Sequence, residues 1–267
     1  MEDLKVAVRD FWDAASCGEV YAIGGTLEAQ FSAHSRARYD LEPYIREFAG
    51  FDGSGKDVLE VGVGMGADHV EWAKSRPNRL VGVDFTPRAV EWTSRRIALA
   101  GLSSQLQVGD AENLPFPDAS FDLVYSWGVL HHTPNTPKAF QEIHRVLRPG
   151  GEARIMIYHR PSIVGFLLWA QYGALARRPF RSLTDIYAHH LESPGTKGYT
   201  VREGRRLVQD FRQATVASAV SFGDLLEGEV GQRHSSAALS MAKRVWPRPL
   251  VRRLSFLGLM LEVRATK

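Results

Sequence analysis

Residues 58–66 constrain the fold of this chain most, because a short apolar run leads directly into three closely spaced glycines, Gly62, Gly64 and Gly66. Glycine adopts positive φ without strain and lets the backbone approach a ligand where a Cβ would clash. A strand that ends in such a loop and continues as a helix is typical of parallel sheets that bind ligands beyond the carboxyl ends of their strands. The segment therefore predicts an α/β fold with a ligand at this loop.

Strand-like runs alternate with helical patterns through the middle of the chain, which predicts a parallel sheet with crossover helices. Thr86 and Pro87 form an N-cap followed by a proline at the first helical position, and Gly101 closes the same helix. A second amphipathic helix is predicted over 137–147, before a Pro-Gly-Gly turn. The predicted strands are 57–61, 80–83, 105–108, 121–125 and 153–158.

The two flanks of this core are less regular. Residues 1–50 predict a helical lid, with one helix that starts near Ser35, and residues 51–267 predict the ligand-binding domain. Beyond the core the pattern predicts helices over 163–176 and 201–211 and strands over 214–220 and 257–265. The segment 226–253 is too long for a hairpin and predicts a helical insertion, so that about 160–255 would carry the specificity-determining insertions.

Composition narrows the class of protein. The net charge is only +3, and the basic residues form no recognisable nucleic-acid-binding module, so no nucleic-acid partner is expected. Cys17 is the only cysteine, which excludes an intramolecular disulfide and a Cys-rich zinc site. The charged N-terminal sequence does not resemble a signal peptide, and no apolar stretch reaches the roughly 18 residues of a membrane span. We therefore expect a cytoplasmic protein.

Three acidic residues follow the first three predicted strands, at the edge where a ligand would lie. Glu60 is at the end of the first strand, where a buried carboxylate needs a partner such as the cationic amino-acid part of a ligand. Asp84 ends the second strand and could accept both hydroxyls of a ribose. Asp110 follows the third strand, where it could bind an adenine amine. Gly62, Gly64 and Asp84 also fit a dinucleotide fingerprint, which leaves an NAD-type oxidoreductase open as an alternative.

The order of the motifs resembles that of class I S-adenosylmethionine-dependent methyltransferases of the small-molecule type 11 kind. The glycine loop, the acid after the second strand, the Gly-Asp-Ala-Glu-Asn-Leu-Pro-Phe turn at 109–116, the Phe-Asp-Leu-Val strand and the Leu-Arg-Pro-Gly-Gly turn recur in this order. Val63 departs from the pattern, since many relatives carry a cysteine there. The resemblance implies a Rossmann-like, doubly wound, seven-stranded, mostly parallel sheet with an antiparallel last strand. It also implies S-adenosylmethionine as cofactor and S-adenosylhomocysteine as product.

The resemblance also assigns cofactor-binding roles to individual positions. Glu60 and the three glycines would hold the methionine part, and Asp84 the ribose, with Phe85 packed on the adenine. The adenine edge would meet Asp110 and Ala111. The residue next to the sulfonium would be Ser126 or Trp127.

Two adjacent histidines, His131 and His132, follow the fourth strand and therefore face the ligand edge. They are the candidate catalytic bases, with a structural role as the alternative. Four aromatic residues are candidates for the substrate site or lid: Tyr21, Tyr39, Tyr158 and His159. No metal site is predicted, because His189 and His190 are adjacent to each other and poorly placed to share an ion.

The sequence thus predicts transfer of a methyl group to a small-molecule acceptor. Oxygen is the favoured target because a histidine base suits a hydroxyl group. An NAD-type oxidoreductase and a non-catalytic scaffold stay open as alternatives, and RNA or lipid methylation as minor ones. The apolar run 162–172 is interpreted as a lid over an apolar substrate or, alternatively, as an element that rests on a membrane surface. Acceptor and oligomeric state are left open.

Overall fold

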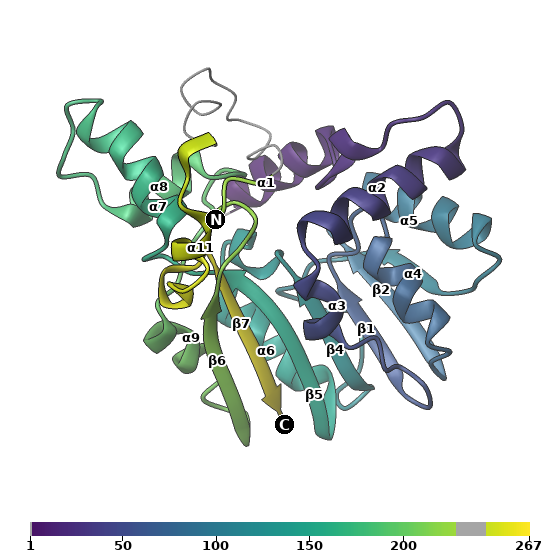
Figure 1. Cartoon of the computed structure of the whole chain (residues 1–267). Coiled ribbons are helices and arrows are strands. Elements are labelled where there is room, and N and C mark those ends of the chain that lie inside the picture. Colours follow the sequence, from purple (N-terminus) through teal and green to yellow (C-terminus); the bar gives the residue numbers. More distant parts are fainter. Residues whose placement is uncertain (1, 228–243) are drawn as a thin grey trace.

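A single mixed sheet organises the chain in the computed structural model, which describes residues 2–227 and 244–267 (Figure 1). Its order is β3-β2-β1-β4-β5-β7-β6. The first five strands are parallel, and β7 is antiparallel to both of its neighbours. The predicted seven-stranded sheet with an antiparallel last strand is confirmed. The strands are β1 (Asp57–Val61), β2 (Arg79–Asp84), β3 (Gln105–Val108), β4 (Phe121–Trp127), β5 (Leu147–Tyr158), β6 (Gln213–Ala219) and β7 (Met260–Thr266).

Strand β5 begins earlier than the sequence pattern predicts. It pairs with β4 from Leu147, and a register shift between Phe121 and Leu123 accommodates the intervening Pro-Gly-Gly turn. A bulge absorbs extra residues in one strand of a pair without ending the pairing. The turn therefore lies inside the strand rather than before it.

Helices cover both faces of the sheet, as expected for a doubly wound fold (Figure 1). Those before and within the first half are α1 (Glu2–Ala14), α2 (Leu27–Leu41), α3 (Tyr44–Ala49), α4 (Ala67–Lys74) and α5 (Pro87–Leu99). The later ones are α6 (Thr136–Val146), α7 (Ile163–Trp169), α8 (Leu183–His190), α9 (Val201–Leu207) and α11 (Arg248–Val251). Short 3₁₀ turns lie at η1 (Glu19–Tyr21), η2 (Leu130–His132) and η4 (Ser255–Leu257), and α7 continues as the π-helical η3 (Ala170–Ala174).

Several helix boundaries correct the prediction. The helix expected to start near Ser35 begins at Leu27, because the Thr26 side chain accepts a hydrogen bond from the backbone N–H of Ala29 and caps it there. Pro43 then separates α2 from α3. The helix expected over 201–211 ends at Leu207. Of the expected insertion over 226–253, residues 228–243 lie outside the described part of the chain, and α11 belongs to the remainder.

Successive side chains of the central strands belong alternately to two hydrophobic cores, one on each face of the sheet. Leu59, Val61 and Val124 pack with α6 and α9 on one face, whereas Val58 and Leu123 pack with α3, α4 and α5 on the other. Because successive strand residues point to opposite faces, a strand buried on both sides needs a continuous apolar run. This is why the central strands read as unbroken apolar segments in the sequence.

The sheet also fixes where a ligand can bind. Strand β1 pairs with β2 on one side and with β4 on the other, so the direction of the chain across the sheet reverses between β1 and β4. In doubly wound sheets the crevice for a ligand lies beyond the carboxyl ends of the strands at this reversal. The glycine loop follows β1 at this crevice.

His34 and Arg96 fasten the N-terminal helices to α5. Arg96 donates to the backbone oxygens of Phe31 and Met65, each at 2.9 Å, and to Nδ1 of His34 at 3.2 Å. Burial, together with the positive charge of Arg96, lowers the pKa of His34 to about 3. The imidazole is therefore neutral in the folded chain at physiological pH.

Acid should weaken this fastening in a way that one substitution reveals. An unfolded histidine titrates near 6.5, so below that pH the unfolded chain gains a proton that the folded chain refuses until about pH 3. Stability should therefore fall as the pH drops below about 6.5, with His34 accounting for about 2 kcal/mol by pH 5. His34→Gln should reduce the slope of Tm against pH between 7.5 and 5, and the exposed His189→Gln should not. Parallel Tm profiles for wild type and His34→Gln would contradict this assignment.

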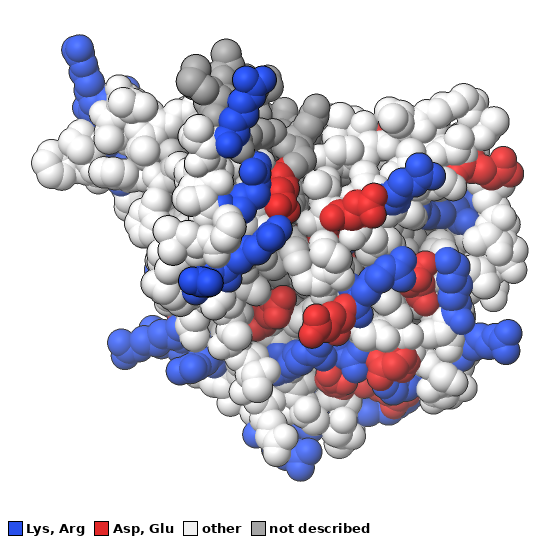
Figure 2. All heavy atoms as spheres, in the orientation of Figure 1, with Lys and Arg blue, Asp and Glu red and all other residues white. Residues whose placement is uncertain are grey.

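No helix in the described ranges is long and apolar enough to cross a membrane. On the face shown in Figure 2, acidic side chains lie among the basic ones at the centre and on the right, whereas the left edge and the bottom show basic side chains alone. Arg248 and Arg252 each lie within 4 Å of a Glu227 carboxylate oxygen.

Candidate active site

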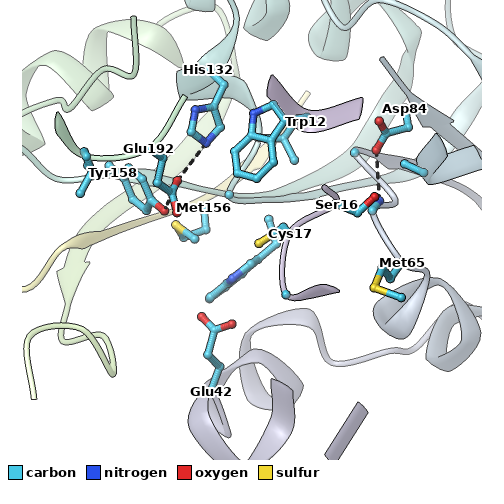
Figure 3. A pocket seen from close by; sticks show the side chains of 18 of the residues that line it. Trp12, Ser16, Cys17, Glu42, Met65, Asp84, His132, Met156, Tyr158 and Glu192 are labelled. Atoms are coloured by element: carbon cyan, nitrogen blue, oxygen red, sulfur yellow. Dashed lines mark hydrogen bonds and ion pairs between the residues drawn. The ribbon is translucent and has the colours of Figure 1, made fainter. Parts of the chain in front are cut away.

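A cavity of about 1110 Å³ lies at the carboxyl ends of β1 and β2. The N-terminal helix α1 and the turn η1 cover one part of it, and α7 closes another. Figure 3 shows Asp84 and Met65 on one side of the cavity and His132, Glu192 and Tyr158 on the other, with Trp12 and Cys17 between them. The cavity is larger than the about 300–1000 Å³ typical of a pocket for one small ligand, so it has room for two molecules together.

Two of the three loop glycines line this cavity, and they differ in what a side chain would meet at each position. At Gly62 (φ 85°) a Cβ would lie 2.1 Å from Cγ2 of Val129, so the turn packs too closely for any side chain. At Gly64 (φ 51°) a Cβ would meet no atom within 4 Å, because it would point into open space. Gly66 does not line the cavity; it starts α4 in the left-handed conformation, against Thr93.

Glu60 lies in the cavity wall and is held by a buried histidine. Its carboxyl oxygen is 2.8 Å from Nδ1 of His69, whose Nε2 is 2.6 Å from Oγ of Ser104. Burial, reinforced by the Asp68 and Asp84 carboxylates, raises the pKa of Glu60 well above its ordinary value. Burial also lowers the pKa of His69 to about 3. A positively charged group bound beside Glu60 would favour its ionised form, which fits the amino group of a ligand's amino-acid part.

The other two predicted acids also lie in the wall. Asp84 accepts hydrogen bonds from the backbone N–H groups of Gly64 (3.1 Å) and Thr86 (3.0 Å), which couples the glycine loop to the end of β2. Burial raises the pKa of Asp84. The Lys5 amine of α1 lies 2.5 Å from a carboxylate oxygen of Asp110 and 2.9 Å from one of Glu112. Helix α1 is thus anchored beside the acid predicted to bind adenine.

An ion pair beneath the cavity was missed by the sequence reasoning. Arg38 of α2 binds Asp68 of α4 through two nitrogens, at 2.8 and 2.6 Å, and both residues line the cavity. The hydroxyl groups of Tyr39 (3.0 Å) and Tyr125 (2.8 Å) also donate to Asp68. Burial alone would raise the pKa of Asp68, but the guanidinium and these donors hold it below the ordinary value. This pair joins α2 to α4, the helix that follows the glycine loop.

A second cluster joins His132 to Glu192 across the cavity from Asp84. Nε2 of His132 is 3.3 Å from a carboxylate oxygen of Glu192, to which the Tyr158 hydroxyl donates at 2.8 Å. On the other side of the ring, Nδ1 is 2.8 Å from Oγ of Ser193 and 3.1 Å from Oγ1 of Thr196. The two contacts at Nδ1 fix the orientation of the imidazole, whereas Nε2 is buried and has no hydrogen-bond partner among the described residues.

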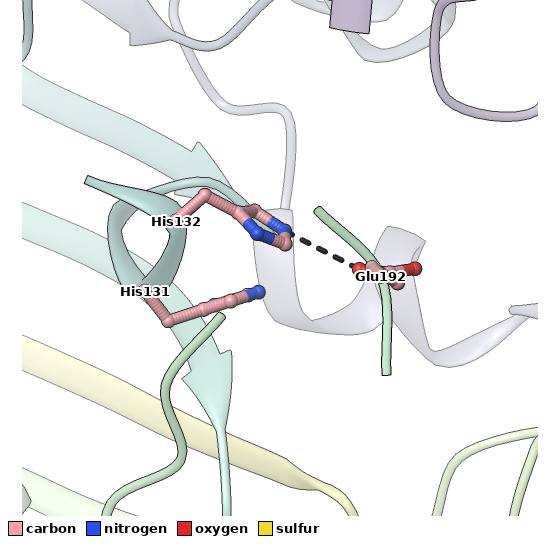
Figure 4. Close-up of side chains that lie close together, drawn as sticks. All are labelled: His131, His132 and Glu192. Carbon is pink, nitrogen blue, oxygen red and sulfur yellow. Dashed lines mark ion pairs between the residues drawn. The ribbon is translucent and has the colours of Figure 1, made fainter. Parts of the chain in front are cut away.

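His131 has a different environment from His132. It is fully buried and does not line the cavity, and its ring packs on Tyr158 with centroids 3.9 Å apart. Within the described part of the chain, neither ring nitrogen has a hydrogen-bond partner, and burial lowers its pKa well below the ordinary value. One nitrogen from each histidine and an oxygen of Glu192 lie within 4.8 Å of one another, a group that could hold a metal ion (Figure 4).

The structure divides the predicted site residues into two sets. Five do not line the cavity: Gly66, Tyr39, Ser126, His131 and His159. Ser126 is buried and donates to the backbone oxygen of Val61 at 2.9 Å, and Nδ1 of His159 is 3.0 Å from the backbone oxygen of Gly258. The remaining predicted residues line the cavity: Glu60, Gly62, Gly64, Asp84, Phe85, Asp110, Ala111, Trp127, His132, Tyr21 and Tyr158.

The charged lining residues that sequence reasoning missed are Lys5, Arg38, Glu42, Asp68 and Glu192. Asp68 alone had a local signal, since it is an acidic residue in the first turn of the helix after the glycine loop. Glu192 reaches the cavity from the irregular segment after α8, where no pattern predicts its position.

The sequence of the site region matches a known family. The profile of the methyltransferase-domain family matches residues 59–155, which include the glycine loop and both acids that follow β2 and β3. The chain is 39% identical over 115 residues to a fatty-acid O-methyltransferase of Mycolicibacterium smegmatis. It is 40% identical over 119 residues to an erythromycin 3''-O-methyltransferase of Saccharopolyspora erythraea.

Residues 59–155 are a class I S-adenosylmethionine-dependent methyltransferase domain. The methyl donor of such a domain is S-adenosylmethionine, and the product is S-adenosylhomocysteine. The two alignments each cover 43% of this chain, and 41% and 38% of the relatives, so the chain spans less than half of either relative.

Solved structures share the fold of this chain over most of its length. A chain from the complex of the Haloferax volcanii Trm112 methyltransferase activator and a methyltransferase matches with a TM-score of 0.60 at 20% identity, over 97% of this chain and 96% of that one. The [4+2]-cyclase SpnF matches with a TM-score of 0.54 at 18% identity, over 100% of this chain and 93% of that one. At these identities the likeness is one of fold alone.

Substitution of Gly64 should separate cofactor binding from stability. We expect Gly64→Val to abolish binding of S-adenosylhomocysteine, because the new side chain projects into the cavity, while the fold persists. Gly101→Val is the matched control: Gly101 also has positive φ (64°) and no neighbour within 4 Å, but it lies at the end of α5, outside the cavity wall. Both variants should lose similar stability, and only the first should lose binding in a calorimetric titration. Equal affinity in the two variants would refute the placement of the cofactor.

A second substitution removes a charge from the same part of the cavity. Asp84→Ala removes the carboxylate predicted to accept the ribose hydroxyls, and it should abolish binding of S-adenosylhomocysteine while far-ultraviolet circular dichroism stays native. Normal affinity in this variant would show that Asp84 does not contact the cofactor.

Proposed function

We propose that the protein transfers the methyl group of S-adenosylmethionine to a hydroxyl oxygen of a small-molecule acceptor. One observation carries this proposal: the glycine loop with Glu60 and Asp84 shares a single cavity with the oriented pair of His132 and Glu192. A cofactor at the loop and an acceptor at the pair would lie side by side. Both relatives described above carry names of O-methyltransferases, which agrees with an oxygen target.

The chain's residues can hold each part of the cofactor. Glu60 would bind the amino group of the methionine part, and Asp84 the ribose hydroxyls. Phe85 would pack on the adenine, whose edge would meet Asp110 and Ala111. Of the two residues expected beside the sulfonium, only Trp127 lines the cavity.

The bound cofactor supplies a methyl carbon activated by the sulfonium, so the enzyme has to align the acceptor and remove its proton. In the proposed step the acceptor oxygen forms a bond to the methyl carbon, the carbon–sulfur bond breaks, and its electron pair stays on sulfur. His132 Nε2 takes the hydroxyl proton. Glu192 then stabilises the imidazolium, while Ser193 and Thr196 keep the ring in place.

His132 is the proposed base, and the assignment does not extend to His131. A base must contact the acceptor, and His132 lines the cavity whereas His131 does not. His131 is buried, its pKa is lowered, and its ring packs on Tyr158, which fits a structural role.

The two alternatives from the sequence make different demands. An NAD-type oxidoreductase would also use the glycine loop and Asp84, so ligand binding decides between them. A scaffold without catalysis would need neither the cofactor acids nor an oriented base. The name of the [4+2]-cyclase SpnF indicates that a chain of this fold can serve a reaction other than methyl transfer, so the fold alone does not carry the proposal.

The first experiment compares thermal stabilisation by S-adenosylmethionine, S-adenosylhomocysteine and NAD. A ligand at about 100 times its Kd adds about 2.7 kcal/mol to the free energy of unfolding, which raises Tm visibly. We expect both adenosyl compounds, and not NAD, to stabilise the chain. Stabilisation by NAD alone would overturn the proposal, and no stabilisation by any of the three would favour the scaffold.

Cytoplasmic location, a role in small-molecule metabolism and the absence of a nucleic-acid partner belong to the same proposal.

Replacing the base should lower turnover without affecting the cofactor. With an acceptor found by transfer of radiolabel from S-adenosylmethionine, His132→Ala should reduce kcat by about 100-fold or more, with an unchanged Kd for S-adenosylhomocysteine. His189→Ala is the control, because that exposed histidine lies outside the cavity wall.

The same assay tests whether a metal takes part. If His132 acts as a base, a chelator should leave the rate unchanged and added Zn²⁺ or Mn²⁺ should not raise it. Loss of activity on chelation, restored by one of these ions, would instead assign His131, His132 and Glu192 to a metal centre.

A further inference from the structure

The part of the cavity away from the glycine loop has walls of a different chemistry. It is formed by α7, by the residue that follows α8, and by the residues next to Asp224 and before β7. The aliphatic side chains of these segments that line the cavity are Val164, Leu167, Leu168, Leu191, Leu226 and Leu259, and the polar Gln171 and Ser221 also line it. We call the six aliphatic residues the apolar chamber.

A buried acid, Asp224, holds the walls of the apolar chamber together but does not line the cavity. Asp224 is fully buried and accepts hydrogen bonds from the backbone N–H groups of Val164 (3.3 Å), Ser221 (2.9 Å) and Leu259 (2.8 Å). The carboxylate thereby fastens α7 and the residue before β7 to its own segment. Because Asp224 does not line the cavity, we infer that the role of its carboxylate is to hold these segments in place.

The lysine and arginine side chains in the described wall of the cavity are already paired with carboxylates. Lys5 and Arg38 are the lysine and arginine among its described lining residues. Lys5 is paired with Asp110 and Glu112, and Arg38 with Asp68. Phosphate recognition calls for guanidinium or ammonium groups that are free to bind it. Among the described lining residues, the phosphate of an acceptor would therefore find no free lysine or arginine.

Carboxyl groups instead lie where the reactive end of the acceptor must bind. Glu192 and Glu42 both line the cavity and reach into it from different elements (Figure 3). A carboxylate placed beside Glu192 would meet a like charge in a partly buried setting, which is unfavourable. A hydroxyl group can instead donate a hydrogen bond there.

We infer that the acceptor is an uncharged apolar alcohol or phenol, whose hydrocarbon body occupies the apolar chamber and whose hydroxyl meets His132 and Glu192. This inference rests on the proposed function, and it sharpens it by excluding acids and phosphate esters. It also separates this chain from its relative named a fatty-acid O-methyltransferase, for which a carboxylate would be the acceptor group.

Matched probes test the inference by binding, without turnover. In calorimetric titrations of the full chain, 1-octanol, octanoate and octyl phosphate share one tail and differ in the head group. We expect 1-octanol to bind about tenfold or more tightly than octanoate, and octyl phosphate to bind no better than octanoate. Equal or tighter binding of octanoate or octyl phosphate, or no binding of 1-octanol, would overturn the inference.

Two neighbouring residues of α7 supply a control for the chamber. Leu167 lines the cavity, and Phe166, exposed to a similar degree, does not. Leu167→Asp should weaken 1-octanol binding by about tenfold or more, whereas Phe166→Asp should leave it unchanged. Glu192→Gln should narrow the preference for 1-octanol over octanoate. Equal effects of the two α7 variants, or an unchanged preference in Glu192→Gln, would contradict the placement of tail or head group.

Failure of this inference can be distinguished from failure of the proposed function. Stabilisation by S-adenosylhomocysteine together with absent octanol binding would overturn the acceptor class alone. Octanol binding without stabilisation by S-adenosylhomocysteine would overturn methyl transfer while supporting an apolar ligand.

Discussion

The buried pair of Arg38 and Asp68 is the interaction on which the arrangement of the cavity depends. It joins a helix of the N-terminal region to the helix that follows the glycine loop, and Tyr125 of β4 donates to the same carboxylate. Removing one partner of a buried pair leaves an uncompensated charge and typically costs about 3–5 kcal/mol. The pair therefore keeps helix α2 in a defined place over the crevice. Apolar contacts alone would fix this position less closely.

The same principle explains how several carboxyl groups coexist around one cavity. Asp68 has a guanidinium, Asp110 has the Lys5 amine, and Asp84 has backbone N–H groups. Glu60 has only a neutral histidine, which is why burial raises its pKa most clearly. The acid with the weakest compensation lies where the family binds the positively charged end of its cofactor. Of these four acids, Glu60 is thus the one for which a bound cation would supply the compensating charge.

Sequence reasoning recovered the parts of the molecule whose signals are local. The strands, the capped helix α5 and the glycine loop announce themselves within a few residues, and the acids Glu60, Asp84 and Asp110 follow from strand ends in a parallel sheet. It failed where a residue's role depends on distant partners. Glu192 lies in an irregular segment and acquires its place only by meeting His132 and Tyr158. Adjacent histidines likewise look equivalent in the sequence, although backbone geometry directs one to the cavity and the other beneath Tyr158.

The contrast between the two ends of the cavity explains why cofactor and acceptor differ in how far they can be predicted. The cofactor end is built by the sheet, where a turn, a glycine and an acid recur at positions set by strand geometry. The proposed acceptor end is built by α7 and the segments fastened to Asp224. In the part of its wall that the structure describes, each lysine and arginine is paired with a carboxylate, and this pairing defines its chemistry as much as the residues that it presents. A pattern search finds residues that are present. Recognising a surface that rejects charged molecules requires knowing which charges are already paired, and that is a property of the folded chain.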